Sequence, residues 1–420
     1  MELQICLELI QVKKINKRLI AVFTGNRAEY GLQYPILRAI EKHPKLDYRL
    51  LVSGAHLDSN FGATLEEIEK DGFHIDAEIK IRMDGSSLFA TAQAIGSGVL
   101  AISEVLDAIR PEMVVVYADR FEGFAAVIAA TQMNIPTAHI EGGDLTEGGA
   151  LDDSVRHAMT KLAHLHFTTN AQASDRILSM GEEQWRINMV GFPAIDLISE
   201  GRFASKVEVI EKLKLDLSRP IVLFTQHSVS TEFEKADSQV RQSLDAIEKL
   251  AEEGIQTILT FPNNDAGGQQ IISSLESFAA KNIKNTSVVS SLGRHLYHGV
   301  LALAKDVDLR IACLGNSSSG IKETPAFGCP TVNIGSRQEG RLRGDNVLDT
   351  EYITEEIYAA VKRSIYDENF RKICRESKNP YWIGEAGPKI AEILSTVAID
   401  QKLIRKKMTF TGQSKVGGLK

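Results

Sequence analysis

Acidic side chains occur at three places in the first half of the sequence, each near the end of an apolar, strand-like run. Asp119 follows residues 113–117, Glu141 follows residues 136–140, and Asp152 begins the run DDSVRH. Neighbouring carboxylates can serve as general base and general acid when one is partly desolvated and a second group assists the leaving group. The first half of the chain is therefore expected to present several carboxylates to a site.

Small polar residues and arginines follow the strand-like runs of the second half. His227 follows residues 221–224, the run GNSSSGIKE at 315–323 is a small-residue turn that leads into a helix, and Arg337 and Arg341 come after the next run. Backbone N–H groups, hydroxyls and guanidinium groups in such turns bind phosphate groups. Asp and Ser after strands are usually helix N-caps. This simpler interpretation weakens where carboxylates end adjacent strands and Ser and Arg clusters end the strands opposite.

Several common catalytic motifs are absent from the sequence. There is no G-x-G-x-x-G after the first strand-like run and no G-x-x-x-x-G-K-[ST], so neither a dinucleotide fingerprint nor a P-loop is present. There is also no G-x-S-x-G and no H-E-x-x-H, and His157, His164 and His166 have no spaced Cys or Glu partner. The sequence therefore offers no motif for a dinucleotide, a P-loop nucleotide, a zinc ion or a serine nucleophile.

Length, charge and cysteine content define the broad class. A chain of 420 residues exceeds what one hydrophobic core usually fills, so two domains of roughly 200 residues each are expected. The formal net charge of −7 argues against nucleic acid or an anionic membrane as a partner, and the longest apolar stretches are only strand-length. The four cysteines lie far apart, which predicts free thiols in a reducing, cytoplasmic compartment.

Short β-branched runs alternate with longer segments whose apolar residues recur at helical spacing, a pattern typical of βαβ units around a parallel sheet. The expected strands are 19–24, 49–53, 113–117, 136–140, 165–168, 188–190, 221–224, 257–261, 286–289, 310–314 and 331–334. The expected helices are 34–42, 87–109, 121–132, 154–163, 171–180, a charged helix within 195–218, 234–253, 269–280, 297–305, 320–326 and 354–366.

These elements predict an α/β fold of two Rossmann-like, doubly wound domains. Pro220, directly before a new strand, favours a domain change near 200–218. The expected parts are an N-terminal extension (1–17), a first domain with the carboxylates (18–205), a phosphate-binding second domain (206–378), a C-terminal helix that packs back on the first domain (379–400) and a tail (401–420). Open sheets of this kind bind ligands at the carboxyl ends of their strands, so we expect the site in a cleft between the domains.

Eight segments carry a resemblance to a known family. They are GNRAEYG (25–31), ADRFE (118–122), HIEGGDLT (139–146), DDSVRHAMTKLAHLHF (152–167), QHSVSTE (226–232), FPNNDAG (261–267), GNSSSGIKETPAFGCPTVNIGSRQEGRLRGDNVL (315–348) and NPYWIGEAG (379–387). In this order, over residues 18–397, they resemble the UDP-N-acetylglucosamine 2-epimerase family in its hydrolysing branch, which includes bacterial enzymes of sialic- and legionaminic-acid synthesis. The non-hydrolysing branch typically reads VEAGLRT where this chain reads IEGGDLT.

The resemblance implies a glycosyltransferase-B-like architecture, a homodimer and a specific reaction on a nucleotide sugar. A base removes the proton from C2 of the sugar while the nucleoside diphosphate leaves C1, which gives a 2-acetamidoglycal. Water then adds to this alkene and delivers UDP and free N-acetylmannosamine or an analogue. Neither a nicotinamide nor a metal takes part in this route.

The resemblance also implies roles for individual residues. Asp119, Glu141 and Asp152 occupy the acid/base positions, Arg156 pairs with one of these carboxylates, and His227 lies near the diphosphate. Ser318 and Ser319, with the helix that follows them, would bind the diphosphate, Glu323 the ribose hydroxyls, and Arg337 or Arg341 the uridine end. Arg27 matches the phosphate-side arginine of the first loop. The other implied substrate- or nucleotide-binding residues are Glu29, Arg120, Asn263, Asn316 and Gly320.

Two departures from the family pattern leave alternatives open. Asn26 stands where the family commonly has Thr or Ser, a change that keeps a small polar turn residue. The loop at 146–151 is longer than usual, so Asp153 could be the acid in place of Asp152, and the sugar could be N-acetylglucosamine or, on UDP or GDP, N,N′-diacetylbacillosamine. A glycosyltransferase of the same architecture is the alternative function, although it has no need of so many carboxylates near C2.

Overall fold

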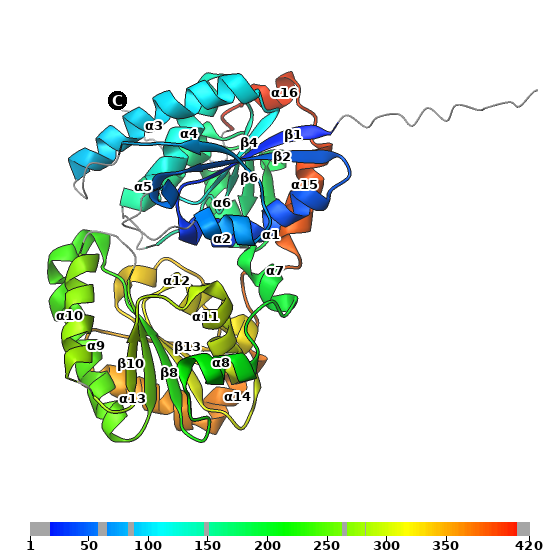
Figure 1. Cartoon of the computed structure of the whole chain (residues 1–420). Helices are drawn as coiled ribbons and strands as arrows, with labels where there is room; N and C mark the ends of the chain where they lie inside the picture. The colour runs from blue at the N-terminus through cyan, green and yellow to red at the C-terminus, as the bar shows by residue number, and fades with distance from the viewer. Residues whose placement is uncertain are drawn as a thin grey trace, which may run out of the picture.

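The computed structural model describes residues 17–57, 65–82, 88–146, 151–262, 267–281 and 283–409, and its elements form two α/β domains (Figure 1). The first domain has a parallel seven-stranded sheet in the order β3-β2-β1-β4-β5-β6-β7. Its strands are β1 (Arg18–Thr24), β2 (Leu46–Ser53), β3 (Ile75–Ile79), β4 (Met113–Tyr117), β5 (Thr137–Ile140), β6 (Leu165–Thr168) and β7 (Ile187–Met189). Helices cover both faces of a parallel sheet, so β4 can read as the continuous apolar run MVVVY and is buried throughout.

The helices of the first domain follow its strands in sequence. They are α1 (Arg27–Lys42), α2 (Leu65–Lys70), α3 (Leu88–Ile109), α4 (Phe121–Gln132), α5 (Leu151–Leu162), α6 (Ala171–Ser179) and α7 (Ala194–Ser199), with short 3₁₀ turns at Gly54–Leu57 and Gln184–Arg186. Asn26 caps α1, because its side chain accepts the Glu29 N–H at 3.0 Å. Each of these helix starts lies close to the carboxyl end of the strand before it, where the site is expected.

Within the described ranges, α3 is the one helix long and apolar enough, by length and composition, to cross a membrane, over Phe89–Ile109. Its buried residues recur every four positions, which is the pattern of a helix that packs along one face; they are Ala90, Ala94, Gly98, Ile102 and Leu106. A Cβ atom at Gly98 would lie 2.9 Å from Cβ of Ala125 on α4, so the two helices are in close contact. This packing is that of a helix on the surface of a domain.

The second domain has a parallel six-stranded sheet in the order β10-β9-β8-β11-β12-β13. Its strands are β8 (Ile221–Thr225), β9 (Gln256–Thr260), β10 (Thr286–Val289), β11 (Ile311–Gly315), β12 (Thr331–Ile334) and β13 (Val347–Thr350). Its helices are α8 (Lys206–Leu213), α9 (Ala236–Glu252), α10 (Gly268–Ala280), α11 (Gly293–Ala302), α12 (Ser318–Lys322), α13 (Thr354–Tyr366) and α14 (Glu368–Glu376). Short 3₁₀ turns occur at Ser230–Lys235, Leu303–Lys305, Thr324–Phe327 and Ser336–Gln338.

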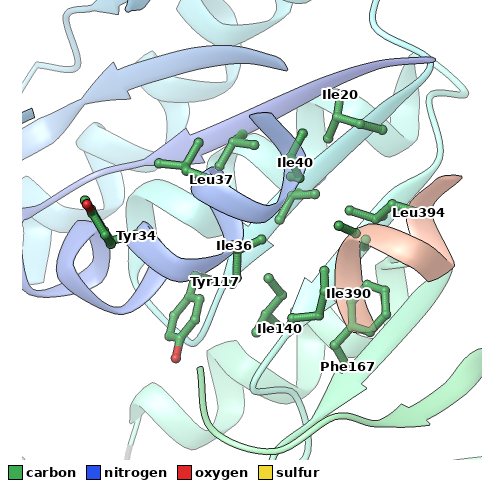
Figure 2. Packing of buried hydrophobic residues seen from close by; sticks show 14 of the residues in the cluster. Ile20, Tyr34, Ile36, Leu37, Ile40, Tyr117, Ile140, Phe167, Ile390 and Leu394 are labelled. Atoms are coloured by element: carbon green, nitrogen blue, oxygen red, sulfur yellow. The ribbon is translucent and has the colours of Figure 1, made fainter. Parts of the chain in front are cut away.

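The chain returns to the first domain after α14. Helix α15 (Ala386–Thr396) lies beside α1, and Figure 2 shows Ile390 and Leu394 among core residues of the first domain such as Ile36 on α1 and Phe167 on β6. The start of α15 is fixed by the buried Asp196 carboxylate, which accepts the N–H groups of Ala386 and Gly387 at 2.9 and 2.8 Å. The first domain is thus built from two separate segments of the chain.

A short C-terminal strap, residues 401–409, closes the first domain and contains α16 (Gln401–Ile404). The buried Arg186 guanidinium donates to the carbonyl oxygens of Leu403 and Lys402, both at 2.8 Å, and to that of His164 at 3.0 Å. Lys406 Nζ donates to the carbonyl oxygen of Ala163 at 2.5 Å. These bonds tie the strap to the loop before β6 and to the turn before β7.

The two-domain, doubly wound α/β architecture expected from the sequence is confirmed, and most element boundaries agree within a few residues. Two edge strands, β3 and β13, and the helices α2, α14 and α16 were not predicted, and α7 and α8 stand where one charged helix was expected. Cys313, Cys329 and Cys374 are buried and unpaired, as expected for a protein with free thiols. The expected extension, at residues 1–16, and the end of the tail, at 410–420, lie outside the described residues.

Candidate functional site

The turn after β5 positions the candidate base. Glu141 has φ 64°, a left-handed conformation that a residue other than glycine rarely adopts and that is concentrated at functional sites. Gly143 has φ 76°, and a Cβ atom there would lie 2.4 Å from the Ala173 carbonyl oxygen, so a side chain does not fit. The sequence EGG therefore makes a tight turn that presents the Glu141 carboxylate, with 4% of the residue exposed, to the second domain.

A lysine from the second domain meets this carboxylate. Lys322, at the end of α12, is 1% exposed, and its ammonium group donates to Glu141 Oε1 and to Asp144 Oδ2. The rings of Phe192 and Tyr381 lie 5.0 and 5.4 Å from Lys322 Nζ. The carboxyl end of β5 and the turn after β11 are therefore joined by a buried ion pair.

Arg341 makes a second contact between the domains. Its Nε donates to the Leu145 carbonyl oxygen at 2.9 Å, and its Nη1 donates to Gln338 Oε1 at 2.6 Å. Burial alone would raise the pKa of the neighbouring Asp144, but the positive charges of Lys322 and then Arg341 outweigh it and lower that pKa. Asp144 is thus a charged member of the site that the sequence analysis did not single out.

Asp119 and Arg156 form a second ion pair beyond the carboxyl end of β4, the central strand of the first sheet. Arg156 is 2% exposed, and its Nη2 donates to Asp119 Oδ2. Burial lowers the pKa of the Arg156 guanidinium to about 9, with the charge of Arg341 adding to the effect, so Arg156 is cationic at neutral pH. Its Nε and Nη1 are buried and have no hydrogen-bond acceptor among the described residues, which makes them available to an anionic ligand.

The two candidate acids at the start of α5 have different environments. Asp152 is exposed, whereas Asp153 is 3% exposed and accepts the Thr146 N–H at 2.9 Å. Asp153 therefore fixes the end of the segment that carries Glu141 and Asp144. The loop between Thr146 and the start of α5, residues 147–150, lies outside the described residues.

Asn316 joins the loops that follow β8 and β11 in the second domain. Its side-chain oxygen accepts the His227 N–H at 2.7 Å, and its side-chain nitrogen donates to the His227 carbonyl oxygen at 2.9 Å. The Asn316 carbonyl oxygen accepts from Arg337 Nη1 at 3.2 Å and from Gln338 Nε2 at 2.8 Å. The structure therefore brings His227, Asn316 and Arg337 together at the carboxyl ends of neighbouring strands of the second sheet.

Glu323 is engaged within its own domain. Its Oε2 accepts from Ser319 Oγ at 2.5 Å and from His298 Nε2 at 2.9 Å. Burial alone would raise the pKa of Glu323, but the bond to His298 outweighs it and lowers that pKa. Ser318 begins α12, and Gly320 is buried with its Cβ position 3.3 Å from the methyl group of Thr331, which leaves no room for a side chain without a shift.

The loop after β1 holds a buried carboxyl group. Glu29 Oε2 accepts the Gly25 N–H at 2.7 Å, and Glu29 Oε1 is buried without a hydrogen-bond partner among the described residues. Burial, with a smaller contribution from the charge of Glu122, raises the pKa of Glu29 to about 8, although the hydrogen bond from the Gly25 N–H opposes this shift. Arg27 is the first residue of α1. Arg120 precedes α4, and its Nε lies 3.6 Å from Glu122 Oε2.

The sequence-predicted residues thus fall into two groups. The structure brings Glu141 into contact with α12 of the second domain, whereas Asp119 pairs with Arg156 of its own domain and Asp152 is exposed. Asn263 lies outside the described residues. Sequence reasoning missed Lys322, Asp144 and His298, although all three lie in or next to segments it had selected; Lys322 and Asp144 are letters of the GNSSSGIKE and IEGGD runs. No three His, Cys, Asp or Glu side chains in the described ranges are grouped to hold a metal ion.

Comparison with known proteins places the chain in a family. The family model described as UDP-N-acetylglucosamine 2-epimerase matches residues 38–395. A UDP-N,N′-diacetylbacillosamine 2-epimerase (hydrolyzing) of Legionella pneumophila is 32% identical over 389 residues, which is 93% of this chain and 98% of that protein. A UDP-N-acetylglucosamine 2-epimerase of Neisseria meningitidis is also 32% identical, over 83% of this chain and 87% of that protein.

Solved structures agree with this assignment at the level of the fold. The crystal structure of UDP-GlcNAc 2-epimerase from Neisseria meningitidis bound to UDP-GlcNAc superposes with a TM-score of 0.73 at 19% identity, over 90% of this chain and 99% of that chain. The enzyme from Methanocaldococcus jannaschii, in complex with UDP-GlcNAc and UDP, superposes with a TM-score of 0.72 at 18% identity, over 90% of this chain and 99% of that one. The chain belongs to the UDP-N-acetylglucosamine 2-epimerase family.

Proposed function

We propose that this protein is a hydrolysing nucleotide-sugar 2-epimerase that converts a UDP-linked N-acetylhexosamine to the free 2-epimer and UDP. The observation that carries the proposal is the contact of the Glu141 carboxylate with the α12 turn of the other domain. Lys322 therefore links Glu141, the candidate base for C2, to the short helix that begins with the candidate diphosphate ligands Ser318 and Ser319. The relatives named as hydrolysing 2-epimerases support the same reaction.

The reaction needs two proton transfers and no change of oxidation state. A carboxylate takes the C2 proton, the C2–H electrons form the C1–C2 double bond, and the C1–O bond breaks with its electrons on UDP. Water then adds its oxygen to C1 while C2 receives a proton on the opposite face, which inverts that centre. Positioned acid/base groups typically contribute about 10²–10⁴ to the rate of such steps.

The side chains divide between chemistry and binding. We assign proton transfer to Asp119 and Glu141, and the unpartnered N–H groups of Arg156 to an anionic part of the substrate, where each bond is charge-assisted. Asp152 is the third acid/base candidate; its side chain is exposed, whereas Asp153 is buried and accepts the Thr146 N–H. Comparison of Asp152→Asn with Asp153→Asn decides between these two residues.

The second domain supplies the nucleotide site in this proposal. The hydroxyls of Ser318 and Ser319, with His227, face the diphosphate, and Arg337 or Arg341 lies at the uridine end. Glu323 accepts from the ribose hydroxyls once Ser319 turns to the phosphate. Replacing both serines with alanine should weaken UDP binding by about 1–3 kcal/mol, since hydrogen bonds to charged groups carry that order of energy. Calorimetric titration with UDP measures this; an unchanged Kd would place the diphosphate elsewhere.

The sugar is the finer part of the proposal. UDP-N-acetylglucosamine is our first candidate, and UDP- or GDP-N,N′-diacetylbacillosamine is the alternative, because relatives of equal identity are named for both kinds of substrate. A cytoplasmic homodimer is proposed on the same family grounds. Incubation with each nucleotide sugar in deuterium oxide, read by NMR, identifies the substrate and tests the route at once.

A glycal route makes a labelled product. Deuterium should appear at C2 of the free sugar, and water labelled with ¹⁸O should place the label at C1 with UDP unlabelled. Asp119→Asn and Glu141→Gln should each lower kcat by about 10² or more with UDP affinity retained. The matched control is Asp107→Asn, which removes one carboxylate from an exposed pair with Arg110. A nucleotide-linked 2-epimer as the final product would refute the hydrolysing assignment.

A further inference from the structure

Lys322 is the buried cation that links the two halves of the proposed site. It is 1% exposed, although lysine is among the residues least often buried, and it donates to two carboxylates of the other domain, Glu141 and Asp144. A buried ammonium group is costly unless it is paired and hydrogen-bonded. Here both acceptors come from one short turn, and the pairing exists only while the two domains are in contact.

The charges around this ammonium group are unbalanced without it. Two buried carboxylates that share a site cannot both remain ionised at low cost, and one of them takes up a proton when no cation is near. The other titratable and charged groups that face the trio are Tyr117 on β4, Arg176 on α6, Glu323 after α12, Arg341 after β12 and Tyr381 before α15. Of the cations, Arg341 acts on Asp144 but is bonded to Leu145 and Gln338, and Arg176 donates to the Gly143 carbonyl oxygen.

The position of Lys322 along the chain connects it to the nucleotide site. It ends α12, the helix that starts with Ser318 and Ser319, and it precedes Glu323. Any movement of this five-residue helix against the first domain therefore moves the ammonium group away from Glu141. The positive charge next to the Glu141 carboxylate is therefore present only when α12 lies against the first domain.

We propose that Lys322 is a positioning residue, whose ammonium group keeps the Glu141 carboxylate charged and oriented only when the α12 turn is docked on the first domain. This role rests on the proposed function for its effect on turnover. It assigns to Lys322 no contact with the reacting atoms. It also makes domain docking a condition for having an active base.

The kinetic test compares Lys322→Met with Lys322→Arg. Methionine keeps the length and apolar stem but removes the charge, so kcat at neutral pH should fall by about 10² or more. The acid side of the kcat–pH profile should move to higher pH, because the paired carboxylates then hold a proton, while the Kd for UDP stays within a few-fold of the parent. Lys322→Arg should restore most of kcat and the parent pH profile. Lys206→Met, which removes an exposed lysine paired with Asp306, is the control.

Three results would overturn the proposal: an unmoved pH profile in Lys322→Met, a Kd for UDP that rises as much as kcat falls, or no rescue by arginine. A second measurement is independent of turnover. Hydrogen exchange of backbone amides in 140–146 should become faster in Lys322→Met and stay unchanged in Lys206→Met, because the contact between the domains is lost. Equal exchange in all three proteins refutes the docking contact. Faster exchange in a protein that turns over no nucleotide sugar refutes the proposed function and retains the contact.

Discussion

Replacing Glu29 with glutamine should stabilise the protein in alkaline solution and have little effect in acid. The Glu29 carboxyl group is buried, accepts the Gly25 N–H and has a pKa raised from its ordinary 4.5 to about 8, chiefly by burial. A raised pKa means that the folded protein binds this proton more tightly than the unfolded chain. The resulting stabilisation is present in full below pH 4.5 and is lost as the pH rises to about 8.

The magnitude follows from the two pKa values. Between about pH 5.5 and about pH 8.5, this one group should lower the free energy of unfolding of the parent protein by about 3 kcal/mol. Glutamine carries no such proton, keeps an oxygen for the Gly25 N–H and offers an amide to the neighbouring Glu122. The stability of Glu29→Gln relative to the parent should therefore rise by about that amount over the same interval.

Urea unfolding followed by fluorescence is the assay, since Trp185 lies in the first domain close to the C-terminal strap. The control is Glu66→Gln, which changes an exposed carboxylate paired with Lys70 on α2 of the same domain. Its stability relative to the parent should not depend on pH in this range. A constant difference between Glu29→Gln and the parent across the whole interval would show that Glu29 is not protonated in the folded protein.

Two further substitutions test contacts inside each domain. Arg186→Met leaves the strap carbonyls without a donor, so the free energy of unfolding should fall by about 3–5 kcal/mol and the strap amides should exchange faster. The control is Arg241→Met, which removes an exposed ion-pair residue and should change the free energy of unfolding by under about 1 kcal/mol. Gly315→Ala should give little folded protein by circular dichroism, because Gly315 has φ 130° and its Cβ position lies 1.9 Å from the Thr225 carbonyl oxygen. Gly31→Ala, in α1 with open space around its Cβ position, should fold normally, and the reverse ranking would contradict this reading of the two positions.

The parts of the fold that the sequence predicted are those with continuous apolar runs. Strand β4 lies in the centre of its sheet and is buried along its whole length, so its sequence alone identifies it. Strands β3 and β13 lie at sheet edges, are partly exposed and read IDAEI and VLDT, in which charged residues interrupt the pattern. Such edge strands carry too little hydrophobic signal to be separated from loops.

The candidate site was predictable to the extent that strand order determines it. Residues at the carboxyl ends of parallel strands meet at one edge of a sheet, so Asp119 and Glu141 could be grouped from the sequence. Lys322 could not be, because a lysine at the end of a short helix is usually solvated and its partner Asp144 is 178 residues away in the chain. Contacts between domains depend on how the two sheets are placed against each other, and no local pattern encodes that placement.

The return of the chain to its first domain has a consequence for biosynthesis. Helix α15 fills part of the first core with Ile390 and Leu394, yet these residues are translated after the entire second domain. During synthesis an apolar surface beside α1 therefore stays exposed until α15 has been made, whereas the second domain contains all of its own core residues in one continuous segment. A chain that ended before residue 386 would hold the whole second domain but a first domain with an open core beside α1, and such exposed apolar surface is prone to aggregation.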